Sequence, residues 1–204
     1  HANRGKPATI NRGFELAQGD YITILDADDE LTANSLRVRW EKATSGTSKA
    51  DCVVGGFTVI DEQGQEVGKR PAPSTASTDT LWHRYFFSYH TPFHLNACLM
   101  HRSLVQRVGR VDPQLTRCED IDYALRILAR SRTFRVIPSS VYCYRKYRTS
   151  RRERIRMRWI TLKKRYAVLK RHAPPPLNVL AALLGVIVDA LKLGYEVSIG
   201  NYTS

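Results

Sequence analysis

Blocks of apolar and polar residues alternate along most of the chain, and their periods predict helices and strands. Apolar side chains at helical spacing, with a proline in the first turn, predict a helix over Pro7–Ala17 that ends before Gly19. The β-favouring runs Tyr21–Leu25 and Asp51–Ile60 predict strands. Because the first strand follows a helix directly and is mostly apolar, we expect an α/β fold with a mainly parallel sheet covered on both faces.

The same periods predict the remaining elements. Further helices are expected over Thr32–Ala43, Leu81–Tyr89, Ser103–Val108, Cys118–Ala129, Arg151–His172 and Leu177–Leu193. Further strands are expected over Glu66–Val67, Asn96–Met100, Phe134–Ile137 and Val141–Tyr144, the last two separated by Pro138. In the helix after Thr32, the side chains available for burial are Leu36, Val38 and Trp40. We therefore expect an α/β domain over residues 1–148 and a helical extension over residues 149–204.

Positive charge is concentrated in this extension. The formal net charge is +13, and the segment Arg145–His172 alone holds thirteen Lys or Arg residues and one acid, Glu153. The rest of the chain is therefore close to neutral. The four cysteines form no C-x-x-C pair and have no His at zinc-finger spacing, so we expect reduced thiols and a cytoplasmic protein.

The acidic run after the first predicted strand is the first candidate site. Asp26 and Asp28 face the same way in extended geometry, at the strand end where α/β proteins bind ligands. Paired carboxylates suit Mg²⁺ or Mn²⁺, with water and phosphate oxygens completing the shell. Leu31 replaces the glycine that a calcium loop would need. The alternative is a solvated acidic turn that caps the next helix.

A second acidic group opens the helix predicted near Cys118. Glu119 and Asp120 stand in its first turn, where the helix dipole stabilises negative charge. A carboxylate there becomes a useful general base if burial or a neighbouring acid raises its pKa. Stabilisation of the helix start alone is the alternative. The two Asn-x-Gly groups near the N-terminus, at Asn3 and Asn11, are further candidates for phosphate or base contacts.

Taken in order, these motifs resemble the family 2 glycosyltransferases of the GT-A fold. The resemblance rests on the paired Asn-x-Gly groups, the stretch Gly19–Asp29, the Glu-Asp pair some ninety residues later, and Tyr144-Arg145 followed by Ser150. It covers about residues 3–150. It implies a Rossmann-related, GT-A-like mixed sheet, mainly parallel and flanked by helices, that lacks the family's first strand and helix. Because the first residue is His1, we expect this chain to begin within a longer protein.

The resemblance implies a role for each motif. The family moves a sugar from a nucleotide diphosphate donor to an acceptor hydroxyl, usually with inversion. Asp26 and Asp28 would hold Mg²⁺ or Mn²⁺ against the diphosphate, Asp120 would be the catalytic base, and Glu119 would position or tune it. The remaining donor contacts would come from Asn3, Gly5, Asn11 and Arg145. This chain differs from the family at Ile10, where Arg is frequent, and at Tyr147, where His is frequent.

The expected partners are a nucleotide diphosphate sugar and a saccharide or lipid-linked acceptor, in cell-surface polysaccharide or glycoconjugate synthesis. Residues 151–193 could lie on the inner face of the cell membrane or dock on the catalytic domain, and nucleic acid ranks last because no base-stacking motif is present. Two other functions compete. One is a non-catalytic module of the same fold that binds membrane or an acidic polymer. The other is a glycoside hydrolase that uses Asp28 and Asp120 without nucleotide or metal.

Overall fold

The computed structural model describes residues 4–87, 91–173, 187 and 190–191. A six-stranded sheet runs in the order β1-β5-β3-β6-β2, with β4 paired to β3. Its strands are β1 (Tyr21–Ile22), β2 (Glu30–Leu31), β3 (Cys52–Ile60), β4 (Glu66–Arg70), β5 (Cys98–His101) and β6 (Phe134–Arg145). The helices are α1 (Lys6–Leu16), α2 (Ser35–Thr44), α3 (Thr78–Phe87), α4 (Arg102–Val108), α5 (Glu119–Arg130) and α6 (Arg151–His172), with a 3₁₀ turn over Leu95–Ala97.

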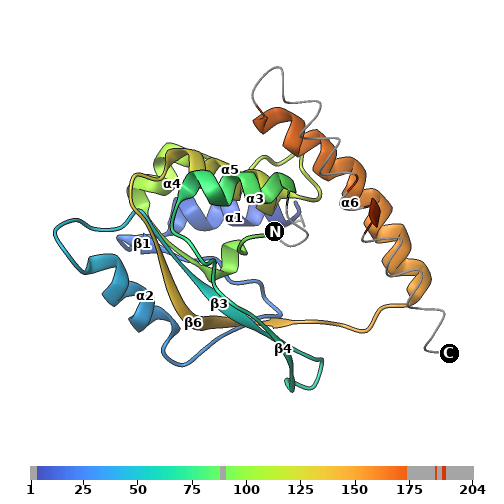
Figure 1. Ribbon diagram of the computed structural model, residues 1–204, viewed down its shortest axis with the longest axis horizontal. Coiled ribbons are helices and arrows are strands. Elements are labelled where there is room, and N and C mark those ends of the chain that lie inside the picture. Colours follow the sequence, from blue (N-terminus) through green and yellow to red (C-terminus); the bar gives the residue numbers. More distant parts are fainter. Residues whose placement is uncertain (1–3, 88–90, 174–186, 188–189, 192–204) are drawn as a thin grey trace.

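Helices cover both faces of the sheet, which confirms the expected α/β layers. Figure 1 shows α1, α3, α4 and α5 gathered over one face and α2 on the other. The parallel part of the sheet is the long β3–β6 pair, and the other four described pairings are antiparallel. The two central strands therefore end together, at Ile60 and Arg145, beside the two-residue strand β2.

Strand β6 is continuous, so the expected break at Pro138 is wrong. The proline is exposed, and the register between β3 and β6 shifts between Val54 and Gly56, where the ladder can lose a hydrogen bond. Glycines in β3 permit this close pairing. A Cβ at Gly55 would lie 2.5 Å from Cγ1 of Val141 in β6, and one at Gly56 would lie 2.6 Å from the carbonyl oxygen of Arg70 in β4, on the other side of β3.

The buried face of α2 is also different from the expected one. Leu36 and Trp40 are 52% and 56% exposed, whereas Arg39 is fully buried. The Arg39 guanidinium donates to Ser35 and, through Nη1, to the Thr23 hydroxyl at 3.0 Å and the Cys98 carbonyl at 2.9 Å. A buried cation is tolerated when its donors are satisfied in this way. These bonds also fix Thr23, which continues the chain from β1 towards the acidic run.

The basic helix α6 is docked mainly through its C-terminal half, although Met157 in the first half accepts a contact from Nη2 of Arg117 at 3.3 Å. Its C-terminal half buries Leu162, Val168 and Leu169, and Nη2 of Arg165 donates to the Tyr85 carbonyl of α3 at 2.7 Å. Its N-terminal half lies away from the sheet in Figure 1, and Trp159 there is 54% exposed. Docking on the α/β domain therefore holds for the second half of α6. Most of the predicted helix Leu177–Leu193 lies outside the described residues. Among the described helices, none is long and apolar enough to cross a membrane.

Candidate active site

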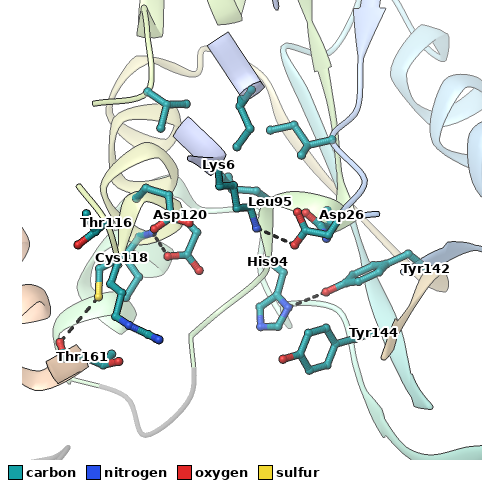
Figure 2. A pocket seen from close by; sticks show the side chains of 17 residues that line it. Lys6, Asp26, His94, Leu95, Thr116, Cys118, Asp120, Tyr142, Tyr144 and Thr161 are labelled. Carbon is teal, nitrogen blue, oxygen red and sulfur yellow. Dashed lines mark hydrogen bonds and ion pairs between the residues drawn. The ribbon is translucent and has the colours of Figure 1, made fainter. Parts of the chain in front are cut away.

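A cavity of about 570 Å³ brings the two acidic segments together (Figure 2). Helix α1 contributes Lys6, the loop after β1 contributes Asp26, and the start of α5 contributes Glu119 and Asp120. The remaining wall comes mainly from residues 94–96, from Tyr142 and Tyr144 of β6, and from Thr161 of α6. Segments that are almost a hundred residues apart in sequence thus share one pocket, as the paired motifs predicted.

Asp26 is paired with a cation from helix α1. The Lys6 ammonium lies 2.6 Å from Oδ2 of Asp26, and both side chains are partly exposed. Burial lowers the pKa of Lys6, but the hydrogen bond and charge of Asp26, with the charges of Glu119 and Asp120, outweigh it and raise that pKa. Lys6 is therefore a charged group in the cavity, and the sequence motifs did not identify it.

Asp28 and Asp29 have opposite environments although they are adjacent. Asp28 is exposed and lines, with Asp26, a neighbouring groove of about 650 Å³ against α1. Asp29 is buried and accepts hydrogen bonds from the Asn96 amide and the Arg145 backbone N–H, both at 2.9 Å. Burial raises the pKa of Asp29 despite these bonds. Asp29 therefore holds the acidic loop against the sheet, a role that its sequence position did not reveal.

Within the described part of the chain, the acidic loop offers a metal ion two accessible carboxylates, those of Asp26 and Asp28. Among the described residues, no group of three or more His, Cys, Asp or Glu side chains converges on one point. Of the two, Asp26 is partly exposed and Asp28 is exposed. Mg²⁺ is usually bound by one or two carboxylates together with water and substrate phosphates. The residues therefore fit a divalent cation that is shared with a phosphate ligand.

The second acidic segment is presented by the start of α5. The residue before the helix, Cys118, has φ of 62°, a left-handed conformation that is uncommon outside glycine and turns the chain sharply into the helix. Asp120 is exposed in the cavity, and its Oδ1 accepts the backbone N–H of Ile121 at 2.8 Å. Glu119 beside it is partly buried, and burial, with the charge of Asp120, raises its pKa. The segment can thus accept a proton at the cavity surface.

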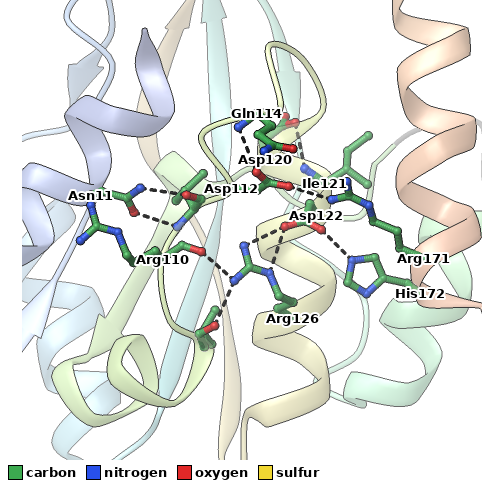
Figure 3. A network of polar contacts seen from close by, with 12 residues as sticks. Asn11, Arg110, Asp112, Gln114, Asp120, Ile121, Asp122, Arg126, Arg171 and His172 are labelled. Atoms are coloured by element: carbon green, nitrogen blue, oxygen red, sulfur yellow. Dashed lines mark hydrogen bonds and ion pairs between the residues drawn. The ribbon is translucent and has the colours of Figure 1, made fainter. Parts of the chain in front are cut away.

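Asp122 is a buried residue of the fold and does not line the cavity (Figure 3). It is 4% exposed, and its carboxylate lies 2.7 Å from Nη2 of Arg126 and 2.9 Å from Nε2 of His172. Arg126 also donates to the carbonyls of Val108 and Arg110. Asp122 therefore joins α5 to α6 and to the segment after α4.

Near the N-terminus, the described residues that were predicted to contact the donor sugar nucleotide have roles in the fold. Asn11 is 2% exposed, and its amide both donates to and accepts from the backbone of Val111, each at 2.8 Å (Figure 3). Val111 lines the cavity, so Asn11 supports the wall from behind. Gly5 precedes α1 with φ of 82°, a conformation that favours glycine. Asn3 lies outside the described residues.

Arg145 ties the acidic loop to a neighbouring turn. Its guanidinium donates to the carbonyl of Asp28 at 3.0 Å, to the carbonyl of Asp61 at 3.1 Å, and to the carboxylate of Glu30. These contacts hold the Asp28 end of the acidic loop in place. A direct contact of Arg145 with a nucleotide sugar stays a prediction.

Comparison with known proteins agrees with the motifs. The sequence pattern of glycosyl transferase family 2 matches residues 1–109. An uncharacterised glycosyltransferase of Methanocaldococcus jannaschii is 29% identical over 143 residues, which is 70% of this chain and 48% of that protein.

Solved structures agree in fold. The crystal structure of S. aureus TarS 1–349 superposes with a TM-score of 0.52 and 11% identity, covering 88% of this chain and 50% of TarS 1–349. The crystal structure of the same protein in complex with UDP superposes with a TM-score of 0.51 and 12% identity, covering 84% of this chain and 47% of that chain. This chain thus spans about half the length of these relatives, and the likeness confirms the GT-A-like fold. Because the family pattern matches more than half of its residues, the chain belongs to glycosyl transferase family 2.

Proposed function

We propose that this protein moves a sugar from a nucleoside diphosphate donor to an acceptor hydroxyl, with inversion, in cell-surface polysaccharide or glycoconjugate synthesis. The observation that carries the proposal is the single cavity that contains Asp26, Lys6 and Asp120. Carboxylates and an ammonium on one side can organise a diphosphate, while a carboxylate on the other side can receive a proton. The complex of TarS with UDP supports a uridine nucleotide as the first donor to test.

In the proposed reaction the acceptor hydroxyl oxygen attacks the anomeric carbon as the bond from that carbon to the diphosphate oxygen breaks. Asp120 takes the hydroxyl proton, and Glu119, beside it in the first turn of α5, would position it. The bonding electrons leave with the diphosphate. Lys6 is placed to offset part of the charge that develops there.

Asp26 and Asp28 would hold Mg²⁺ or Mn²⁺ in this scheme. Bound there, the ion would act as a Lewis acid towards the diphosphate. In the described structure the Lys6 ammonium occupies one oxygen of Asp26, so we infer that Lys6 moves towards the phosphates when Asp26 takes a metal ligand role.

The exposed half of α6 is the proposed membrane contact. Arg152, Arg154 and Arg156 are exposed there, next to the exposed ring of Trp159. Basic side chains flanking an aromatic ring suit the anionic, partly apolar surface of a membrane. This placement would bring the cavity near a lipid-linked acceptor. Co-sedimentation with vesicles containing anionic lipid tests it, and binding that is unchanged after Arg152→Gln and Arg156→Gln would refute it.

Nucleotide binding and turnover test the transferase proposal. We would titrate UDP into the full chain with and without Mn²⁺, and then measure UDP release from a panel of UDP sugars with candidate acceptors. We expect binding that depends on Mn²⁺ and falls about tenfold or more in Asp28→Ala. Asp20→Asn, which changes an exposed acid outside the cavity lining, is the matched control. Binding that Asp28→Ala leaves unchanged would refute the metal role. A chain that binds membrane but no nucleotide would favour the non-catalytic module.

A further inference from the structure

One polar side chain in the cavity wall has no part in the scheme above. His94 precedes the 3₁₀ turn Leu95–Ala97 and lies in the wall between Tyr142 and the start of α5 (Figure 2). Its Nδ1 lies 2.6 Å from the Tyr142 hydroxyl. Its Nε2 has no hydrogen-bond partner among the described residues. A half-buried ring nitrogen that faces a ligand-sized cavity is a group available to a ligand.

The bond to Tyr142 determines which hydrogen His94 can offer. Burial lowers the pKa of His94 and raises that of Tyr142, so both groups are neutral at ordinary pH. If Nδ1 carried the proton, the Tyr142 hydroxyl hydrogen would have no acceptor among the described residues. If the hydroxyl donates to Nδ1 instead, both atoms of this contact are paired, and the one hydrogen without a partner among the described residues lies on the cavity side of the ring. The proton of His94 is then on Nε2, which becomes a donor into the cavity.

Aromatic rings hold the imidazole in this orientation. Phe57 stacks on His94 with ring centroids 4.3 Å apart and planes at 25°, and Tyr144 meets it edge-on at 5.8 Å. Tyr144 is itself 39% exposed and lines the same cavity. The wall therefore presents a partly exposed aromatic ring beside one fixed N–H group. A sugar ring, which has an apolar face and hydroxyl groups at its edge, matches this pair of features.

We propose that Nε2–H of His94 donates a hydrogen bond to a hydroxyl of the donor sugar, that Tyr144 packs against the same sugar ring, and that His94 thereby selects the sugar that is transferred. This inference rests on the proposed transferase function and assigns it a specificity residue. A neutral donor suits a hydroxyl better than a phosphate, because phosphates are bound most strongly by charged donors. The cation suited to the phosphates is Lys6, paired with Asp26.

The test separates the sugar from the nucleotide. Binding of UDP and of UDP-glucose, UDP-galactose, UDP-N-acetylglucosamine and UDP-N-acetylgalactosamine would be measured with Mn²⁺ for the full chain and for His94→Ala and His94→Gln. We expect UDP affinity within about twofold of the wild type in both variants. We expect the preference among sugars to fall about 10- to 100-fold in His94→Ala and to return in part in His94→Gln, whose amide can still donate.

The Tyr142→Phe variant tests whether the Tyr142 hydroxyl keeps the His94 proton on Nε2. It leaves the ring in place but removes the hydroxyl that directs the proton to Nε2, so we expect sugar preference between that of the wild type and that of His94→Ala. Circular dichroism melting of each variant controls for folding.

Three results would overturn the inference. Unchanged sugar preference in His94→Ala would refute the contact. An equal loss of UDP and UDP-sugar affinity would place the contact on the diphosphate. Absence of any nucleotide binding by the wild type would refute the proposed function and this inference with it, whereas the first two results leave the proposed function standing.

Discussion

The two acidic segments have similar sequences, yet each divides its carboxylates between two tasks. In the first segment Asp26 opens into the cavity, while Asp29 is buried and bonded to Asn96. In the second, Asp120 opens into the cavity, while Asp122 is buried between Arg126 and His172. In both cases the open and the buried acid are two or three residues apart. We infer that the acids exposed to the cavity take part in catalysis or ligand binding, and that the buried acids stabilise the fold.

The open acids themselves differ in their partners. Asp26 is paired with Lys6, whereas Asp120 accepts only the N–H of Ile121 among the described residues. A carboxylate that is already paired with a cation suits the binding of charged groups. A carboxylate with a free oxygen suits proton transfer. The comparison therefore gives each open acid a separate role, which substitutions can test.

The largest expected effect comes from removing the open acid of the second segment. Asp120→Asn keeps the shape and the bond to Ile121 but removes the base, so we expect UDP release in the transfer reaction to fall about 10³-fold. The melting temperature should stay near that of the wild type. Asp20→Asn, at an exposed acid outside the cavity lining, is the control and should keep full turnover. A loss of less than about tenfold in Asp120→Asn would exclude it as the base.

The buried acid of the same segment should affect stability instead. Asp122→Ala leaves Arg126 and His172 without their carboxylate, so we expect the free energy of unfolding to fall by about 3 kcal/mol in urea denaturation. Asp112→Ala is the matched control, because its pair with Arg171 is more exposed and should contribute about 1 kcal/mol or less. Equal losses in the two variants would contradict the assigned role of Asp122.

The pH dependence of stability provides a milder test of the same pair. Burial opposes ionisation of Asp122, but His172 and Arg126 outweigh it and lower its pKa in the folded chain. A lowered pKa means that the contribution of Asp122 is complete above its unfolded pKa of about 3.9 and is lost as the pH falls through the folded value. Melting curves between neutral pH and about pH 3 should thus converge for the wild type and Asp122→Asn at the acid end. A difference that is constant with pH would contradict this linkage.

The smallest effect concerns the pair in the first segment. Lys6→Met removes the ammonium that competes for Asp26, so we expect Mn²⁺ affinity without nucleotide to rise about two- to fivefold. The electron paramagnetic resonance signal of free Mn²⁺ measures this directly. Lys49→Met, at an exposed lysine near Asp20, is the control. A fall in Mn²⁺ affinity in Lys6→Met would show that Lys6 supports the metal site.

The sequence predicted the parts of this site that depend on local pattern. Helix α1, strand β3 and the acidic start of α5 follow from apolar spacing and from turn residues, and motif order placed Asp26 and Asp120 in one site. Side chains brought in by tertiary contacts were not predictable in this way. Lys6 and His94 carry no local signal of their distance from Asp26, and burial of Arg39 depends on a carbonyl that another strand supplies. The sequence also did not show which acids of each acidic segment are exposed and which are buried.

Turnover per folded molecule of Asp122→Asn tests the division of roles most directly. UDP release would be measured well below the melting temperature and normalised to the folded fraction from circular dichroism. The assignment of Asp122 to the fold predicts a rate within about twofold of the wild type, although the variant is less stable. A rate lowered about 10³-fold, as expected for Asp120→Asn, would place Asp122 in the chemistry and contradict the division between open and buried acids.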